Sequence, residues 1–140
     1  MDIPFADIFS TCQELSEFEG RRIKNASGES IYSEVLITEQ DEALVSHLAA
    51  DAAYLLEARI LSIDSSEIDP GTHDITITFA EDAQLKTASE DEVLHVIASY
   101  VLWKWLEDKD ETRHKAYELI FTTALNALRG SIRRKRPTLR

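Results

Sequence analysis

Two short stretches of the sequence have the residue types and spacing of a metal site. Each places a glutamate three residues before a histidine: Glu92 before His95, and Glu111 before His114. Residues three apart share one face of a helix, and di-iron carboxylate proteins use this spacing to bring both side chains to one metal ion. The chemistry that these two stretches could carry out is therefore metal binding.

Three arguments favour a different role for these residues. Both glutamates fall in the first turn of an expected helix, where a carboxylate satisfies free backbone N–H groups. A di-iron centre also needs glutamates from inside two further helices, and only Glu57, with Glu14 or Glu17, is available. The two stretches should also lie at opposite ends of a helical hairpin. We therefore expect helix capping and surface histidines, and no metal or cofactor.

Common catalytic signatures are missing from the sequence. It has no nucleophile elbow, P-loop, dinucleotide fingerprint or zinc-protease helix, and its four glycines offer little material for a phosphate loop. Cys12 lies on an apolar face and is expected in the core. A lone cysteine excludes an internal disulfide and favours a reducing compartment. We therefore expect no enzyme and no catalytic residues.

Hydrophobic periodicity predicts four helices as the scaffold for these side chains. They cover residues 3–18, residues 38–61, residues 89–106, and a stretch from Asp110 that ends at Gly130 or, at the latest, before Pro137. Thr38, Ser89 and Asp110 are the expected N-caps, because their oxygens can accept free backbone N–H groups. The last two helices should form an antiparallel hairpin, since the connection between them is short.

The third of these helices is apolar nearly all round from residue 93 to 106. Such a helix should be central or face two partners. It carries Trp103 and Trp105, which we expect either to pack in the core or to anchor another subunit.

One strand is clear in the sequence, but its partner is not. Residues 74–79 alternate large apolar side chains with threonines, which is the period of a strand. A lone strand leaves its backbone unpaired, so residues 30–37 or a strand of another molecule should complete it. Residues 65–72 read as a loop with a turn at Asp69-Pro70-Gly71.

These elements predict a mainly α fold: a four-helix single domain with a small inserted β element, either a strand or a two-stranded ribbon. Residues 1–128 would form an acidic helical domain, and residues 129–140 a basic C-terminal extension. Apolar runs fall short of the roughly 20 residues that a membrane span needs, and the first residues lack a secretion signal. We therefore expect a protein that is neither inserted in a membrane nor secreted.

Charge is divided unevenly along the chain. The formal net charge is −11, yet the last twelve residues hold six Arg and Lys and no acid. Residues 1–128 are left with nine basic and 26 acidic side chains, a net charge of −17. Such a body should repel nucleic acid and anionic lipid, and a basic recognition helix is absent.

The basic block Arg133, Arg134, Lys135 and Arg136 should seek phosphate, an acidic partner or a neighbouring copy of the body. It could also make non-specific DNA contact. The alternative is that these side chains only complement the negative end of the last helix and aid solubility.

The order of these elements resembles a known family. An acidic helix start at residues 38–41 leads into an alanine-rich helix at 49–54, followed by a connector with one strand. The apolar stretch at 100–106 comes next, and then a last helix that ends in the basic block at 133–137. Over residues 38–137 this is similar to the small head–tail connector, or head-completion adaptor, proteins of tailed bacteriophages and prophages.

The resemblance implies a non-enzymatic virion assembly protein. Identical subunits would form a ring, dock beneath the portal and receive a tail-completion protein. The expected location is then the virion or the bacterial cytoplasm. The residues that we expect to contact partners or other subunits are Trp103, Trp105, Arg133, Arg134, Lys135 and Arg136.

Two other classes stay open. A small regulatory or interaction protein could use the basic C-terminal tail to bind an acidic partner or nucleic acid. A metal-dependent or small-molecule enzyme is the third class, and the sequence supports it least.

Overall fold

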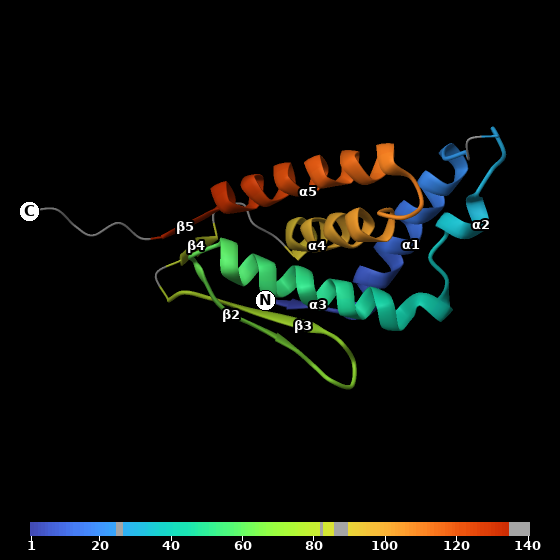
Figure 1. Ribbon diagram of the computed structural model, residues 1–140. Helices are drawn as coiled ribbons and strands as arrows, with labels where there is room; N and C mark the ends of the chain where they lie inside the picture. The colour runs from blue at the N-terminus through green and yellow to red at the C-terminus, as the bar shows by residue number, and fades with distance from the viewer. Residues whose placement is uncertain (25–26, 82, 86–89, 135–140) are drawn as a thin grey trace, which may run out of the picture.

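Four long helices make up most of the computed structural model, which describes residues 1–24, 27–81, 83–85 and 90–134. They are α1 (Phe5–Arg22), α3 (Glu42–Arg59), α4 (Glu90–Trp105) and α5 (Glu111–Ser131) (Figure 1). A single helical turn, α2 (Tyr32–Val35), and a 3-10 turn, η1 (Glu39–Asp41), lie between α1 and α3. The mainly α fold predicted from the sequence is confirmed.

Two of the predicted helix starts are visible in the hydrogen bonds. The Asp110 carboxylate accepts the backbone N–H of Arg113 at 2.9 Å and so caps α5. Ahead of α3, the Asp41 carboxylate accepts both the backbone N–H and the hydroxyl of Thr38, at 2.9 and 3.1 Å. The third predicted cap, Ser89, lies outside the described residues.

A small antiparallel sheet covers one side of the helices. Its order is β1 (Asp2–Ile3), β3 (Ile75–Phe79) and β2 (Ile63–Ile68). The predicted turn at Asp69 joins β2 to β3, because the Asp69 carboxylate accepts the backbone N–H groups of Thr72 and Gly71 at 2.9 and 2.7 Å. These bonds also hold the pKa of Asp69 below its usual value.

The predicted pairing of the central strand is wrong. β3 pairs on one side with β2 and on the other with β1, and Met1 exchanges both backbone hydrogen bonds with Ile77. The strand therefore finds its partners within its own chain, and not in residues 30–37 or another molecule. Residues 65–68, expected in a loop, belong to β2.

Two other expectations about local structure also need correction. Residues 32–35 form α2 in place of a strand. α1 begins at Phe5 and continues past Gly20 to Arg22. A Cβ atom at Gly20 would lie 2.9 Å from the ring of Tyr32, so a glycine at this position allows α2 to approach α1 closely.

α4 is the centre of the molecule, which is one of the two positions predicted for it. In Figure 1 it lies between α5 and α3, and α1 and β1 also contact it. Its buried apolar residues are Val93, Val96, Ile97, Ala98, Val101, Leu102 and Trp105. The apolar surface of α4 is therefore covered by the helices and strand of its own chain.

Residues 129–134 do not form a separate extension. α5 runs to Ser131, and β5 (Ile132–Arg134) pairs antiparallel with β4 (Ala83–Leu85). The predicted boundary at residue 129 thus falls inside α5, and the side chain of Ile132 is buried. Among the described residues, no helix combines the length and hydrophobicity needed to cross a membrane.

Candidate functional site

Trp105, predicted to pack in the core or to anchor another subunit, packs inside its own chain. Its side chain is buried at the end of α4, and its Nε1 donates a 2.7 Å hydrogen bond to the carbonyl of Val35. The Lys109 ammonium lies 4.0 Å from the centre of the Trp105 ring. The indole therefore fastens α2 to α4, and the cation covers its outer face.

Trp103 lies in a half-buried aromatic cluster between α4 and α5. Its ring stacks on Phe121 at 5.7 Å and on His114 at 6.3 Å, and meets Tyr100 edge to face at 5.7 Å. The Lys104 ammonium lies 4.0 Å from its centre. Its Nε1 is buried without a hydrogen-bond partner among the described residues. Core packing thus accounts for most of this ring too.

Tyr100 and His114 are the polar members of this aromatic cluster besides Trp103. Burial raises the pKa of Tyr100 above its usual value, and the charge of Asp51 on α3 raises it further. The phenol therefore stays protonated at neutral pH. His114 is held in place by a 2.7 Å hydrogen bond between its Nδ1 and the carbonyl of Trp103.

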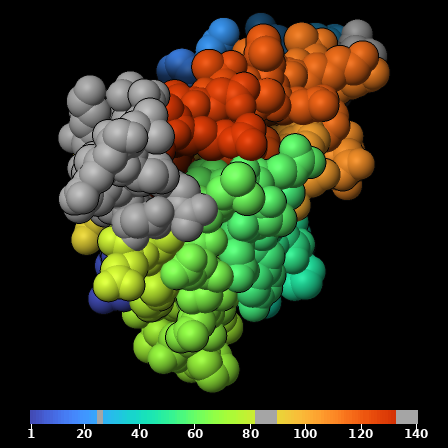
Figure 2. Space-filling view, turned by 90° about the vertical axis from the view of Figure 1, so that its left-hand side faces the viewer, coloured from blue at the N-terminus to red at the C-terminus, as the bar shows by residue number. Residues whose placement is uncertain are grey.

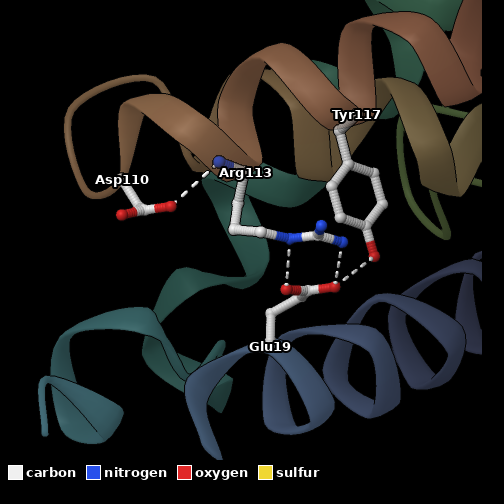
Figure 3. Close-up of polar contacts among 4 residues, drawn as sticks. All are labelled: Glu19, Asp110, Arg113 and Tyr117. Carbon is white, nitrogen blue, oxygen red and sulfur yellow. Dashed lines mark hydrogen bonds and ion pairs between the residues drawn. The ribbon is translucent and has the colours of Figure 1, made fainter. Parts of the chain in front are cut away.

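A buried ion pair joins α1 to α5 (Figure 3). Glu19 is only 1% exposed, and its carboxylate accepts 2.7 Å hydrogen bonds from Nε and Nη2 of Arg113. The Tyr117 hydroxyl approaches the same carboxylate at 3.5 Å. Two parallel bonds of this kind fix both the spacing and the rotation of the two helices.

The electrostatics of this cluster keep Arg113 charged and Tyr117 protonated at neutral pH. The hydrogen bond to Glu19 raises the pKa of Arg113 above its usual value. Burial raises the pKa of Tyr117 to about 12, and the neighbouring Glu19 carboxylate adds to this shift. The arrangement is therefore a fixed structural ion pair.

The sequence contained a signal for this ion pair that its analysis missed. Phe5, Ile8, Cys12 and Ser16 form the buried stripe of α1, and Glu19 continues it with helical spacing. A carboxylate on such a stripe must find a cation, because an unpaired buried charge is costly. The partner could not be named, since Arg113 lies 94 residues away.

The two Glu-x-x-His stretches do not combine into a metal centre. Glu92 accepts a 3.0 Å hydrogen bond from Ser131 at the end of α5, whereas Glu111 pairs with Lys115 at 3.1 Å at its start. They therefore lie at opposite ends of the hairpin, as expected. Within the described part of the chain, His, Cys, Asp and Glu do not gather in any group of three that could hold a metal ion.

Cys12 occupies the predicted core position. Its side chain is fully buried on α1, and burial raises its pKa to about 12. Such a thiol is a packing residue rather than a nucleophile.

The basic block is placed only in part. The backbones of Arg133 and Arg134 belong to β5, where they pair with Gln84 and Ala83. Lys135 and Arg136 lie outside the described residues. β5 lies at the end of the molecule opposite α2 (Figure 1).

An acidic groove lies along the outer side of α1. Two adjoining hollows of about 650 and 530 Å³ share Ser10, Gln13 and Glu39. Together we call them the α1 groove. The carboxylates that line it come from Glu14, Glu17, Glu39, Glu42 and Asp74. Lysine, arginine and histidine are missing from its described lining, whereas a hollow beside Trp105 is lined by both Lys104 and Lys109.

Comparison of this chain with models of protein families, with curated proteins and with solved structures found no match.

Proposed function

We propose that this protein is a non-enzymatic structural adaptor of the head–tail connector type. Copies of the chain would assemble into a ring that docks to a portal or tail-completion protein. The observation that carries the proposal is the separation of charge: a folded body of net charge −17 up to residue 128, and six basic residues with no acid from residue 129 onward. Opposite charges at separate places favour contact between copies.

Neither the central strand nor the apolar helix α4 is left open for contact with another copy. β3 is paired within its own chain, and α4 is covered by its own helices. What remains besides charge is a set of large apolar side chains exposed on the surface, namely Phe18, Leu44, Tyr54, Leu61 and Leu119. Leu119 borders an apolar hollow of about 390 Å³ beside Ile120 and Ala124, and an apolar patch of this kind is suited to burial against a partner.

The acidic body suits a component of a channel that carries DNA. Like charges repel over a distance set by the ionic strength, so an acidic wall would let DNA slide without sticking. The virion is then the expected location after assembly, and the bacterial cytoplasm before it.

Sedimentation velocity of the full chain over a wide range of protein concentrations tests this proposal. We expect a discrete species larger than the 15.9 kDa subunit that grows in proportion with concentration. A single 15.9 kDa species up to the solubility limit, which also fails to bind a portal protein, contradicts it.

A second candidate is a small regulatory or interaction protein that uses the basic segment to bind an acidic partner or nucleic acid. The four consecutive basic residues at 133–136 favour this second candidate. This candidate is tested by truncation after Arg134. Removal of residues 135–140 leaves β5 intact, whereas truncation at residue 129 would remove the end of α5 and the buried Ile132. Loss of a single partner on this truncation, from a protein that is always monomeric, supports this candidate.

A further inference from the structure

The α1 groove combines two kinds of surface. Apolar side chains line both of its hollows: Pro4, Phe5 and Phe9 in one, Leu36 and Ile37 in the other. Exposed carboxylates stand beside them. Within the described part of the chain, Glu14, Glu39 and Glu42 form no ion pair, while Glu17 pairs with Arg21 at 2.6 Å. A basic segment with some apolar residues would match both features.

Residues 135–140 have this composition. They read Lys-Arg-Pro-Thr-Leu-Arg, so three cations flank a proline and a leucine. The cations can pair with the free carboxylates, and Pro137 and Leu139 can cover the apolar lining. The lengths also agree. Six extended residues span about 20 Å, and α1 rises about 18 Å between Phe5 and Glu17.

The segment cannot fill the groove of its own chain. Arg113, near the start of α5, binds Glu19 at the end of α1. From Arg113 to Ser131, α5 rises about 27 Å, and β5 leads further on. Residues 135–140 extend at most about 20 Å beyond Arg134. They therefore fall short of the part of the groove at Glu17.

The positions of β5 and α2 agree with this distance between the C-terminal segment and the groove. β5 lies at one end of the molecule and α2, which borders the groove through Tyr32, at the other (Figure 1). Seen from the end at which α5 finishes, the C-terminal parts of α3 and α5 lie side by side at the surface (Figure 2).

We propose that the α1 groove binds residues 135–140 of a second copy of this chain. The contact is head to tail, because one copy supplies the groove and the next supplies the segment. Such heterologous contacts build a closed ring when the rotation between copies divides a full turn. The inference deepens the proposed function and rests on it for the identity of the partner.

A charge exchange between full-length variants tests this contact. The segment-reversed variant carries Lys135→Glu, Arg136→Glu and Arg140→Glu, and the groove-reversed variant carries Glu14→Lys, Glu39→Lys and Glu42→Lys. Each alone should fail to self-associate, because its groove and segment have the same sign. Mixing the two restores opposite signs at every contact, so light scattering should show assembly return only in the mixture. Assembly that persists in either variant alone overturns the inference.

Binding of a peptide separates this inference from the proposed function. A fluorescent peptide of residues 129–140 is titrated with full-length segment-reversed protein, whose own segment cannot compete. We expect binding that weakens about tenfold or more when the three groove reversals are added, since several weak ion pairs act together. A peptide that does not bind, or that binds both proteins equally, overturns the inference whatever the mass of the wild-type protein.

The matched control reverses three exposed acids outside the groove: Asp64→Lys, Glu67→Lys and Glu118→Lys. It changes the net charge by the same amount. It should leave peptide binding within about threefold, because distant exposed charges are screened. An equal loss in the control shows a general charge effect and overturns the groove as the site. Assembly of the wild type with peptide binding absent would retain the proposed function and reject this inference.

Discussion

At the scale of single residues, the charged groups inside the protein hold helices together. Glu19 and Arg113 are far apart in the sequence and form the bidentate pair that sets α1 against α5. Burial costs the carboxylate more free energy than the guanidinium, because the Glu19 side chain is 2% exposed and the Arg113 side chain is 26% exposed. The loss of stability on replacing one residue of the pair should therefore differ from the loss on replacing both.

Arg113→Met should destabilise the protein by about 3 kcal/mol, because it leaves the Glu19 charge buried and unpaired. The double variant Glu19→Leu with Arg113→Met should recover most of that loss, since an apolar pair needs no counter-ion. Urea denaturation of the three proteins measures the difference. A single variant within about 1 kcal/mol of wild type would show that the pair is not held as described.

Tyr117 gives a pH dependence with a definite sign. Its pKa is raised from 10.0 to about 12 in the folded state, chiefly by burial. The unfolded chain therefore loses this proton first, and the contribution of Tyr117 to stability is present below pH 10 and lost as the pH rises towards 12. Tyr117→Phe should flatten the fall in the free energy of unfolding across this window. An unchanged slope in the variant would contradict this assignment.

Cys12 should resist thiol reagents in the folded protein. Its side chain is fully buried and its pKa is raised to about 12, so neither access nor thiolate is available near pH 8. Ellman's reagent should react with it only in denaturant. Rapid reaction of the native protein would place Cys12 outside the core.

At the scale of the elements, the hairpin of β2 and β3 supports the first helix. The Asp74 side chain, next to β3, accepts the backbone N–H of Phe5 at 2.8 Å. Pro4 precedes α1 and provides no side-chain acceptor, so the cap comes from a residue 69 positions away. The sheet therefore supplies what the local sequence of α1 lacks.

Asp74→Ala should reduce the free energy of unfolding by about 1 kcal/mol, the usual cost of losing a helix cap. Asp74→Asn is the matched control, because the amide oxygen can accept the same bond. Thermal unfolding followed by circular dichroism compares the two. Equal stability of the alanine and asparagine variants would mean that the cap contributes nothing.

Prediction from the sequence succeeded where the signal is local. Asp110 and the turn at Asp69 each act on groups within four residues, so their function can be read from spacing alone. β2 was missed because Ile63–Ile68 has polar residues at four of its six positions and becomes a strand by pairing with β3. The alternation at residues 30–37 was misread, since Val35 is buried as part of a helical turn and its carbonyl binds Trp105.

The α1 groove could not be predicted from the sequence, because its residues are not close together along the chain. Its carboxylates come from α1, η1, α3 and the turn before β3, which only the fold brings together. The basic block was found because its four charges are consecutive.

At the scale of the whole molecule, the central feature is the division of charge: residues 1–128 have a net charge of −17, and residues 129–140 hold six basic side chains and no acid. Electrostatic attraction between exposed groups weakens as salt shortens the screening length, from about 10 Å at 0.1 M to about 3 Å at 1 M. If copies meet through their opposite charges, assembly must weaken with salt and must require residues 135–140.

The most direct test of this account is the mass of the full chain in solution, measured by light scattering at low and at high salt and compared with the chain truncated after Arg134. We predict a discrete multiple of 15.9 kDa for the full chain at low salt, and 15.9 kDa both at high salt and for the truncated chain. A full chain that remains at 15.9 kDa under both conditions, or an assembly that salt and truncation leave unchanged, would contradict the account.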